Sequence, residues 1–291
     1  MVKHHPHRLP EWAKPHIRSL GAAHDLKVRL RQAGLHTVCE SAKCPNIGEC
    51  FQRPTATVMI MGDICTRNCS FCAILRDRPG ALDPDEPRRL ADMILDVGLR
   101  HVVMTSVARD DLSDEGAAHF AACVRELKSR DASIVVEILT PDFHARPELL
   151  DVVADAPYDI FNHNLETVRR LQRKVRPQAD YDRSLAVLAG MAARRPDALV
   201  KSGIMVGLGE TNDEVYATLA DLHAHGVRAL TIGQYLRPRE SNQPVHRYVT
   251  PAEFDEFRDR ARSHGFRFVA SGPLVRSSYL ADRQVDLSAV S

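Results

Sequence analysis

Two groups of three cysteines carry most of the chemistry that this sequence offers. In "CTRNCSFC", residues 65–72, the spacing is C-x3-C-x2-C, and in "CESAKCPNIGEC", residues 39–50, it is C-x4-C-x5-C. A cubane iron–sulfur cluster contains four irons and is normally held by four thiolates. Three thiolates leave one iron without a protein ligand, and that iron can hold a small molecule. The six cysteines are Cys39, Cys44, Cys50, Cys65, Cys69 and Cys72.

Disulfide, zinc and ferredoxin interpretations fit these cysteines less well. Within a triplet, pairing two cysteines as a disulfide leaves the third unpaired. Disulfides are also rare in the reducing compartment that we expect for a large chain without a secretory signal. Structural zinc prefers four Cys or His ligands; Cys69 and Cys72 form one C-x2-C pair, but no His follows at finger spacing. The C-x2-C-x2-C spacing of a ferredoxin is absent. Cys123 lies in an apolar helical pattern and is expected to be a small core residue.

The composition sets limits on location and partners. The chain has 291 residues, with 39 Lys and Arg against 38 Asp and Glu and a net charge of +1. Such a balance gives no bulk attraction to nucleic acid or acidic lipid. No apolar run approaches the roughly 18 residues of a membrane span, and the polar, His-rich start lacks the apolar core of a secretory signal. We therefore expect a cytoplasmic protein with no nucleic-acid and no membrane partner.

Extended apolar runs alternate with amphipathic helical patterns after residue 54. The runs are rich in Val, Ile and Met and lack polar alternation, which is typical of strands covered on both faces. Strands are predicted at 55–62, 101–107, 133–139, 158–164, 199–207 and 229–236. The clearest helices are predicted at 86–98, 113–130, 211–226 and 250–265, from their capping residues and closing glycines.

Six strand–helix repeats imply a parallel sheet with right-handed crossovers. Because no dinucleotide fingerprint is present, we expect an α/β fold of the partial (β/α)6 TIM-type barrel kind. One structural domain is expected, with an N-terminal extension over 1–54, the barrel over 55–265 and a C-terminal extension over 266–291. Chemistry in such barrels lies on the loops after the strands. The C-x3-C-x2-C stretch comes directly after the first predicted strand, with Gly62 and Asp63 turning the chain.

The spacing in "CTRNCSFC", with Phe71 before the last cysteine, resembles the signature of radical S-adenosylmethionine (SAM) enzymes. In that superfamily the open iron binds the methionine end of SAM, and one electron from the cluster yields a 5′-deoxyadenosyl radical. Its fold is a full or partial (β/α) barrel. The two triplets together resemble lipoyl synthase. The resemblance runs from about Leu35 to Tyr279, through "TSVARDDLSDEGAAHF", "FNHNLETV", "KSGIMVGLGE" and "SGPLVRSSY".

The resemblance to lipoyl synthase implies a function for each cysteine triplet. The family inserts two sulfur atoms, at carbons 6 and 8 of an octanoyl group on a protein lysine. It uses two 4Fe–4S clusters. By resemblance, Cys65, Cys69 and Cys72 hold the cluster that cleaves SAM, whereas Cys39, Cys44 and Cys50 hold the auxiliary cluster that donates sulfur. The family's fourth auxiliary ligand is a serine of the R-S-S-Y motif, found here at residues 276–279, and we favour Ser278 over Ser277.

Polar residues near the predicted strand ends are our candidates for binding SAM. Ser106 and Asp110 follow the second strand, where the superfamily typically binds the methionine amine; nearby Arg109 is a candidate for positioning or substrate contact. Glu137, which we place at the end of the third strand, could accept hydrogen bonds from ribose hydroxyls. Asn162, after the fourth strand, is a similar candidate, and Lys201 on the fifth is expected to meet a carboxylate.

The resemblance also implies partners. These are octanoylated lipoyl carrier domains, namely the E2 subunits of 2-oxoacid dehydrogenases and the glycine cleavage H protein, and an electron donor of the flavodoxin or ferredoxin type. Two alternatives stay open from the residues. One is a biotin-synthase-like sulfur inserter that acts on a free small molecule. The other is a non-enzymatic electron carrier or zinc-stabilised scaffold, which would cleave no SAM.

Overall fold

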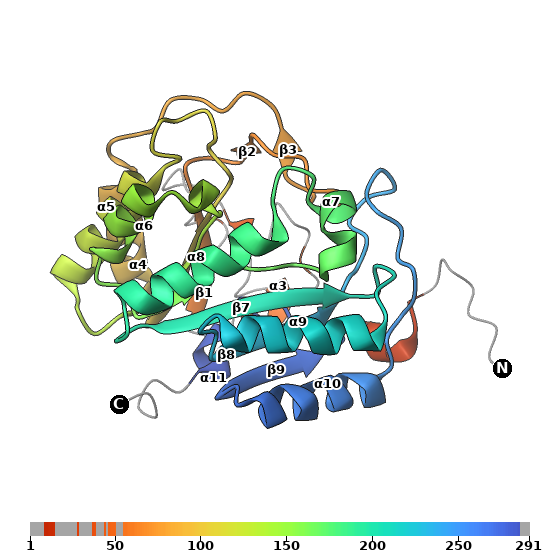
Figure 1. The fold of residues 1–291 in the computed structure, drawn as a ribbon. Helices are drawn as coiled ribbons and strands as arrows, with labels where there is room; N and C mark the ends of the chain where they lie inside the picture. Colours follow the sequence, from red (N-terminus) through yellow and green to blue (C-terminus); the bar gives the residue numbers. More distant parts are fainter. Residues whose placement is uncertain are drawn as a thin grey trace.

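The centre of the molecule is a curved sheet of seven parallel strands (Figure 1). The structure is a computed structural model that describes residues 9–14, 28, 37–38, 44, 46–50 and 55–285. The sheet strands are β1 (Thr55–Ile60), β4 (His101–Ser106), β5 (Val135–Leu139), β6 (Ile160–Asn162), β7 (Leu199–Val206), β8 (Ala229–Gln234) and β9 (Phe268–Gly272).

The strands pair in the order in which they occur along the chain, from β1 to β9. Each pair is parallel, with registers such as Thr55 beside His101 and Asn162 beside Lys201. Within the described residues, β1 and β9 each pair on one side only, so the sheet is a barrel left open at one seam. A short parallel pair, β2 (Ile64–Cys65) and β3 (Leu75–Arg76), lies outside this sheet.

Helices in the crossovers cover the outer face of the sheet (Figure 1). The long ones are α4 (Glu86–Val97), α5 (Ala117–Arg130), α6 (Pro147–Ala154), α8 (Tyr181–Arg194), α9 (Asn212–Ala224) and α10 (Pro251–His264). Shorter turns are η1 (Glu11–Ala13), α3 (Ile47–Cys50), η2 (Phe143–Ala145), η3 (Arg169–Leu171), α7 (Gln172–Val175) and α11 (Ala281–Gln284).

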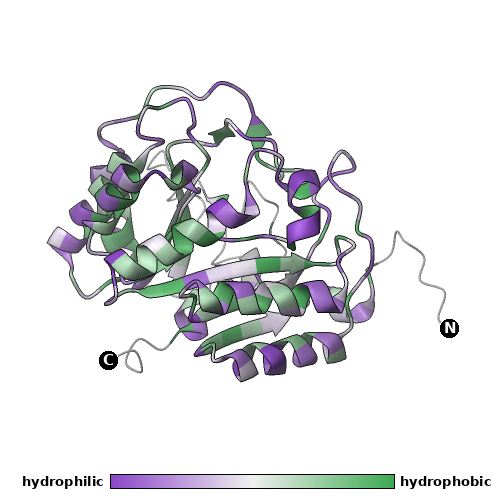
Figure 2. Cartoon of the chain, in the orientation of Figure 1, coloured by the Kyte–Doolittle hydropathy of each residue, from purple (hydrophilic) through white to green (hydrophobic). Residues whose placement is uncertain are grey.

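Local sequence signals account for the ends of several helices. Thr211 and Thr250 each form a capping box at the start of α9 and α10, in which the threonine oxygen accepts from the third helical N–H. Gly98 and Gly265 end α4 and α10 in the left-handed conformation, which costs a residue without a Cβ little. Apolar faces then pack on the sheet, while α10 turns a hydrophilic face outward (Figure 2).

The predicted α/β partial barrel is confirmed, with one strand more than expected. All six predicted strands are present, with ends within two residues of the prediction, and Cys123 is fully buried in the core. The additional strand, β9, lies inside the segment 266–291 that we expected to be an extension. Its sequence, "FVASG", is short and contains small residues, so it carries little strand signal.

Helix α5 begins later than its sequence suggested. We expected it to open at Ser113, but it starts at Ala117. The carboxylate of Asp114 accepts hydrogen bonds from the N–H groups of Gly116 and Ala118, so Asp114 forms a turn before the helix. Glu115 and Gly116 have φ values of 51° and 84° in this turn, which no α-helix accommodates.

None of the helices in the described part of the chain has the length and apolar character that a membrane crossing requires.

Candidate active site

The C-x3-C-x2-C loop leaves the carboxyl end of the first barrel strand, as predicted. After β1, Met61 and Gly62 have φ values of 64° and 84°, and this left-handed turn directs the chain across the end of the barrel. The Cys65 sulfur then accepts hydrogen bonds from the backbone N–H groups of Arg67 (3.4 Å) and Ala108 (3.3 Å). Such donors stabilise charge on sulfur and influence the potential of a cluster bound there.

Two other barrel loops hold the second half of this stretch. The N–H of Ser70 donates to the carbonyl of Val175 (2.9 Å), and the Asn242 side chain donates to the carbonyls of Ser70 (3.1 Å) and Cys72 (2.7 Å). Burial raises the pKa of Cys69 and raises that of Cys72 to about 12, and the charge of nearby cysteines adds to both effects. The three thiols are therefore near enough to influence one another, and iron would replace their protons on binding.

Arg67, inside the cysteine loop, is held between two carboxylates. Its guanidinium donates to Asp110 at 2.6–3.1 Å and lies 2.8 Å from Asp142. Asp142 is fully buried and also accepts from Arg183 (2.9 Å). Burial alone would raise the pKa of Asp142, but the hydrogen bond and charge of Arg67 hold it well below its usual range. Asp110, a predicted SAM contact, thus already has Arg67 and Thr66 (2.7 Å) as partners.

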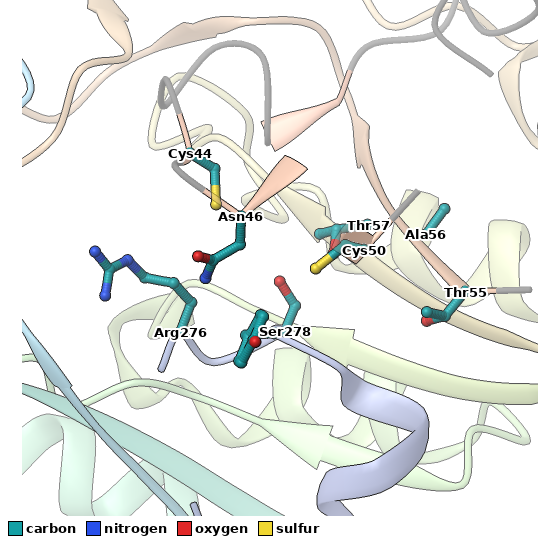
Figure 3. Close-up of a pocket in the computed structure, with 9 residues that line it drawn as sticks. Cys44, Asn46, Cys50, Thr55, Ala56, Thr57, Arg276 and Ser278 are labelled. Atoms are coloured by element: carbon teal, nitrogen blue, oxygen red, sulfur yellow. The ribbon is translucent and has the colours of Figure 1, made fainter. Parts of the chain in front are cut away.

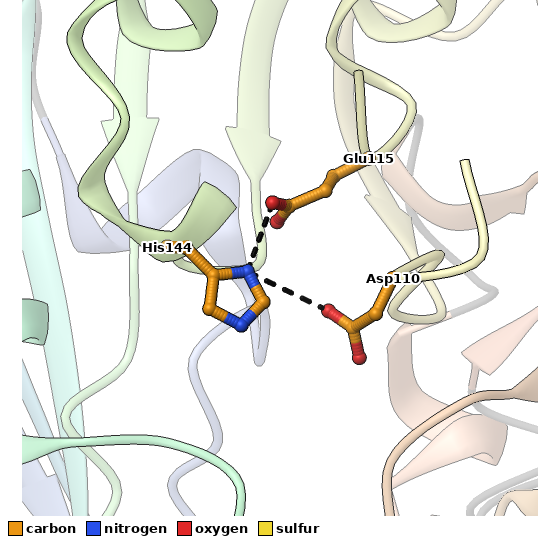
Figure 4. A group of neighbouring side chains, drawn as sticks. All are labelled: Asp110, Glu115 and His144. Atoms are coloured by element: carbon orange, nitrogen blue, oxygen red, sulfur yellow. Dashed lines mark hydrogen bonds and ion pairs between the residues drawn. The ribbon is translucent and has the colours of Figure 1, made fainter. Parts of the chain in front are cut away.

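Beside this ion pair, Asp110, Glu115 and His144 bring three metal-binding side chains together (Figure 4). Nδ1 of His144 lies 2.8 Å from Glu115 Oε1 and 4.0 Å from Asp110 Oδ1. Asp110 is bound by Arg67 and His144 by Glu115, although the buried Oε2 atom of Glu115 has no hydrogen-bond partner within the described residues. We assign the group a structural role at the end of the barrel.

Two predicted SAM contacts keep free hydrogen-bonding capacity at strand ends. Ser106 is the last residue of β4 and Asn162 the last of β6. The buried Ser106 hydroxyl and the Asn162 Oδ1 atom have no hydrogen-bond partner within the described residues. A buried polar atom without a partner is costly, and a polar ligand removes that cost. These two atoms are therefore suited to contact a bound molecule.

Glu137 and Lys201, by contrast, bind each other. The Lys201 ammonium lies 3.0 and 2.9 Å from the two Glu137 oxygens, so Lys201 meets a carboxylate of the chain itself, and its predicted contact with the cofactor stays a prediction. Asn162 Nδ2 donates to Glu137 Oε1 (2.7 Å) and His101 lies 3.8 Å away. Glu137 is the third of five residues in β5, which corrects our placement of it at the strand end. Burial would raise the pKa of Glu137, but the Lys201 charge lowers it to about 2.

The segment after β6 contains site residues that the sequence analysis missed. Burial raises the pKa of Glu166, and its charge adds to the raised pKa of both Cys69 and Cys72, so it lies close to these thiols. Asn164 donates to Glu166 (3.1 Å), while its buried Oδ1 has no partner within the described residues. Arg176 binds the Asn164 carbonyl (3.0 Å), and its charge lowers the pKa of Cys69.

Two signals could have identified Asn164 and Glu166. Asn162, Asn164 and Glu166 recur at every second position from the last strand residue onward, and residues two apart share a face as long as the chain stays extended. Gly203 on β7 is the second signal, because a Cβ there would lie 2.8 Å from Asn164 Oδ1. The glycine in "KSGIMVG" therefore makes room for this side chain.

The second cysteine group lies where the two ends of the chain meet (Figure 3). A pocket of about 20 Å³ is lined by residues from before β1, from the start of β1 and from after β9. Ser278 lines the pocket and its oxygen points toward Cys50, whereas Ser277 is not among the lining residues. Cys39 lies outside the described residues. The lining residues are Cys44, Asn46, Cys50, Thr55, Ala56, Thr57, Arg276, Ser278 and Tyr279.

The electrostatics of this pocket suit an anionic group. Burial lowers the pKa of the Arg276 guanidinium, and the charge of nearby Cys44 opposes that effect. Burial also raises the pKa of Cys50 to about 11, partly offset by a backbone hydrogen bond from Leu280. A buried guanidinium beside thiols is stabilised once the thiols become thiolates around a metal. The donor set and the charge therefore both fit an iron–sulfur cluster.

Comparisons with known proteins agree with this geometry. Residues 59–222 match the Radical SAM superfamily. The chain is 55% identical to the lipoyl synthase of Methylococcus capsulatus over 280 residues, which cover 96% of this chain and 87% of that protein. It is 54% identical to the lipoyl synthase of Pasteurella multocida, with 94% and 87% covered.

Solved structures of other superfamily members share the fold. Streptococcus suis SuiB bound to S-adenosylmethionine matches with a TM-score of 0.57 at 11% identity, and this chain covers about half of that protein, 51%, with 83% of its own length. Methylornithine synthase (PylB) matches with a TM-score of 0.57 at 15% identity, covering 88% of this chain and 72% of that one. At these identities the matches establish the fold alone. The curated relatives and the match to the Radical SAM superfamily show that the chain belongs to the lipoyl synthase family of radical SAM sulfurtransferases.

Proposed function

We propose that this enzyme inserts two sulfur atoms, at carbons 6 and 8, into an octanoyl group bound to a lysine of a lipoyl carrier domain. One observation carries the proposal. The chain has two separate cysteine sites, one on the loop after β1 and one between the two chain ends. A radical enzyme that only cleaved SAM would need the first site alone. The second supplies a place for a cluster that gives up its sulfur.

Cys65, Cys69 and Cys72 are the proposed ligands of the 4Fe–4S cluster that acts on SAM. When bound, this cluster and SAM supply one electron and a carbon radical able to remove hydrogen from an unactivated carbon. The chain's own part is to hold the loop and to orient SAM. The Arg67 bonds to Asp110 and Asp142 hold the loop, and the N–H groups of Arg67 and Ala108 stabilise charge on Cys65.

The free buried oxygens at the strand ends support a SAM site over this loop. We propose that Ser106, Asn162 and Asn164 contact SAM directly, because each has an oxygen that lacks a partner within the described residues. Glu137 and Lys201 act through Asn162, whose amide nitrogen is fixed by its bond to Glu137. Asp110 acts through Arg67. Three of the five predicted SAM residues are thus proposed to position other groups rather than to touch the cofactor.

Cys39, Cys44, Cys50 and Ser278 are the proposed ligands of the auxiliary cluster. The pocket lined by Cys44, Cys50 and Ser278 supports this ligand set. A serine oxygen is a harder ligand than a thiolate, so its bond to iron is the weaker one. A site that must release iron and open a sulfide benefits from one weak bond. In domain terms, the segments before β1 and after β9 form one auxiliary unit across the open seam of the barrel.

The test is an anaerobic assay of the reconstituted enzyme with reductant, SAM and an octanoyl-lysine peptide. Mass spectrometry would follow 5′-deoxyadenosine and the peptide. We expect deoxyadenosine and a peptide that gains two sulfurs as the dithiol under the reducing assay conditions, and that loses two hydrogens when air then oxidises the dithiol to the dithiolane ring. Deoxyadenosine with an unmodified peptide would refute the proposed substrate class and favour a free small molecule. If protein that holds both clusters formed no deoxyadenosine, the result would refute SAM cleavage and leave the electron-carrier interpretation.

Three cysteine variants separate the functions of the two sites. We expect Cys69→Ala to abolish deoxyadenosine formation, and Cys44→Ala to spare it while stopping sulfur insertion. Cys123→Ala is the control, because Cys123 is buried in α5 and belongs to neither site. Lipoyl product from both Cys69→Ala and Cys44→Ala would contradict the proposed roles.

The proposed macromolecular substrates are the E2 subunits of 2-oxoacid dehydrogenases and the glycine cleavage H protein. The proposed electron donor is of the flavodoxin or ferredoxin type. Turnover with each purified carrier, and with each donor in place of a chemical reductant, tests these assignments.

A further inference from the structure

Two side-chain hydrogen bonds fasten the second cysteine segment to the C-terminal motif. Asn46 Nδ2 donates to the carbonyl of Leu274 (2.6 Å), and the Tyr279 hydroxyl donates to Glu49 Oε2 (2.8 Å). Asn46 is only 5% exposed. Because these bonds join residues 228 and 230 positions apart, they connect opposite ends of the chain directly.

The placement of these bonds relative to the proposed ligands gives them a purpose. Asn46 and Glu49 both lie between Cys44 and Cys50, and Tyr279 directly follows Ser278. The next residue, Leu280, supplies the backbone hydrogen bond that partly offsets the raised pKa of Cys50. The residues that directly follow Ser278 are therefore bound to the cysteine segment through Tyr279 and Leu280.

The barrel contacts the same segment at Gly233. A Cβ at Gly233, in β8, would overlap the carbonyl oxygen of Val275, and it would lie 3.3 Å from the Arg276 guanidinium. The chain after β9 can approach β8 this closely because residue 233 has no side chain. The close approach of Val275 to Gly233 and the hydrogen bond of Tyr279 to Glu49 thus define where the R-S-S-Y segment lies.

We propose that Glu49 and Tyr279 are positioning residues that hold Ser278 against Cys44 and Cys50 before any iron binds. The inference rests on the proposed function, in which Ser278 is a ligand of the auxiliary cluster. A single serine oxygen is too weak a ligand to gather two distant chain ends by itself, because closing a long loop costs entropy. The Glu49–Tyr279 bond brings the two chain ends together before the cluster binds, so the entropy of closing the loop does not have to be offset by the serine–iron bond. Ser278 can then be a weak ligand that iron releases easily.

The decisive variant is Tyr279→Phe, which removes one hydroxyl and keeps the ring. A hydrogen bond to a charged acceptor is worth roughly ten-fold or more in an equilibrium constant. We therefore expect a chelator to remove iron from the auxiliary site about ten-fold faster in Tyr279→Phe. SAM cleavage to 5′-deoxyadenosine should stay at the wild-type rate, because the first site is untouched. Glu49→Ala should behave like Tyr279→Phe, whereas Glu49→Gln retains an acceptor and should largely recover iron retention.

The matched control is Tyr216→Phe. Tyr216 on α9 also donates to a glutamate, Glu256 on α10, but on the outer surface. We expect it to change neither readout. Hydrogen exchange of the iron-free chain gives a second measurement, in which residues 46–50 and 273–280 should exchange faster in Tyr279→Phe than in the wild type.

Unchanged iron release and unchanged exchange in both Tyr279→Phe and Glu49→Ala would overturn the inference. Cys44→Ala distinguishes this failure from failure of the proposed function. If Cys44→Ala loses auxiliary iron while Tyr279→Phe retains it, only the positioning role is wrong. If Cys44→Ala retains all the iron of the wild type, the auxiliary site itself is wrong and the positioning role falls with it.

Discussion

Lys201→Met is the most informative substitution in the barrel interior. Methionine keeps an unbranched chain of four atoms in place of the lysine stem but has no charged nitrogen, so Glu137 would remain buried beside Asn162 and the more distant His101. Removing one partner of a buried ion pair leaves an uncompensated charge, which typically costs 3–5 kcal/mol. The pKa of Glu137, lowered from 4.5 to about 2, corresponds to roughly 3 kcal/mol of stabilisation of its charged form. The two routes agree on a large loss of unfolding free energy at pH 7.

The pH dependence of that loss has a definite sign. In the wild type the lowered pKa of Glu137 stabilises the fold above pH 4.5, and this contribution is lost as the pH falls toward 2. In Lys201→Met burial dominates and the pKa of Glu137 rises above its ordinary value. The folded state then binds the proton more tightly than the unfolded state does. The loss of stability relative to the wild type should therefore shrink as the pH falls from 7 toward 5.

Urea unfolding followed by circular dichroism, under anaerobic conditions at pH 5 and pH 7, measures both effects. Lys201→Met with Glu137→Gln should recover much of the lost stability, because it removes the unpaired charge. Arg88→Met is the control, since Arg88 pairs with Asp92 at the surface and should cost about 1 kcal/mol or less. A loss below about 1 kcal/mol in Lys201→Met, or one that grows on acidification, would refute the buried-pair argument.

Three further predictions test other parts of the structure. Burial lowers the pKa of His163 to about 4. As the pH falls from 6.5 to 4, the wild type should therefore lose about 1 kcal/mol of stability per pH unit, because the unfolded state binds a proton that the folded state does not. Urea unfolding should show a flatter pH dependence in His163→Gln. Gly233→Ala should displace Val275 and lower the amount of iron bound at the auxiliary site, measured as iron and sulfide per protein. Gly80→Ala is the control and should leave that amount unchanged, because nothing lies within 4 Å of a Cβ at Gly80. Arg67→Lys cannot bind Asp110 and Asp142 together with the same geometry, so SAM cleavage and iron retention at the first site should both fall at least ten-fold.

The sequence carried enough information to predict the elements that are encoded locally. Buried strands read as continuous apolar runs, and Thr211 and Thr250 specify their helix starts through side chains three residues away. The cysteine loop could be placed because it directly follows such a run. Strand β9 was missed because its small residues have little strand propensity of their own, and the strand is defined by its pairing with β8.

The contacts of the polar site residues depended on the register of distant strands. Glu137 was expected to face ribose, but β7 brings Lys201 to it from 64 residues away. Asn162 stays a candidate, whereas Glu166 was missed, since its position near Cys69 arises from the chain path after β6. Periodicity alone cannot reveal which buried polar groups satisfy one another and which retain a free atom for a ligand.

The order of the sheet strands also fixes an order of assembly during synthesis. Each strand pairs with the one that the ribosome delivers next, so the barrel can grow from its N-terminal edge as the chain emerges. Apart from its local pairing with residues 76–77, the described hydrogen bonds of the 65–72 loop to other loops come from residues 108–243, whereas the position of Ser278 depends on the chain beyond β9. A nascent or truncated chain would thus complete the contacts of the C-x3-C-x2-C loop before those of Ser278. Under the proposed function, sulfur insertion then waits for the segment after β9.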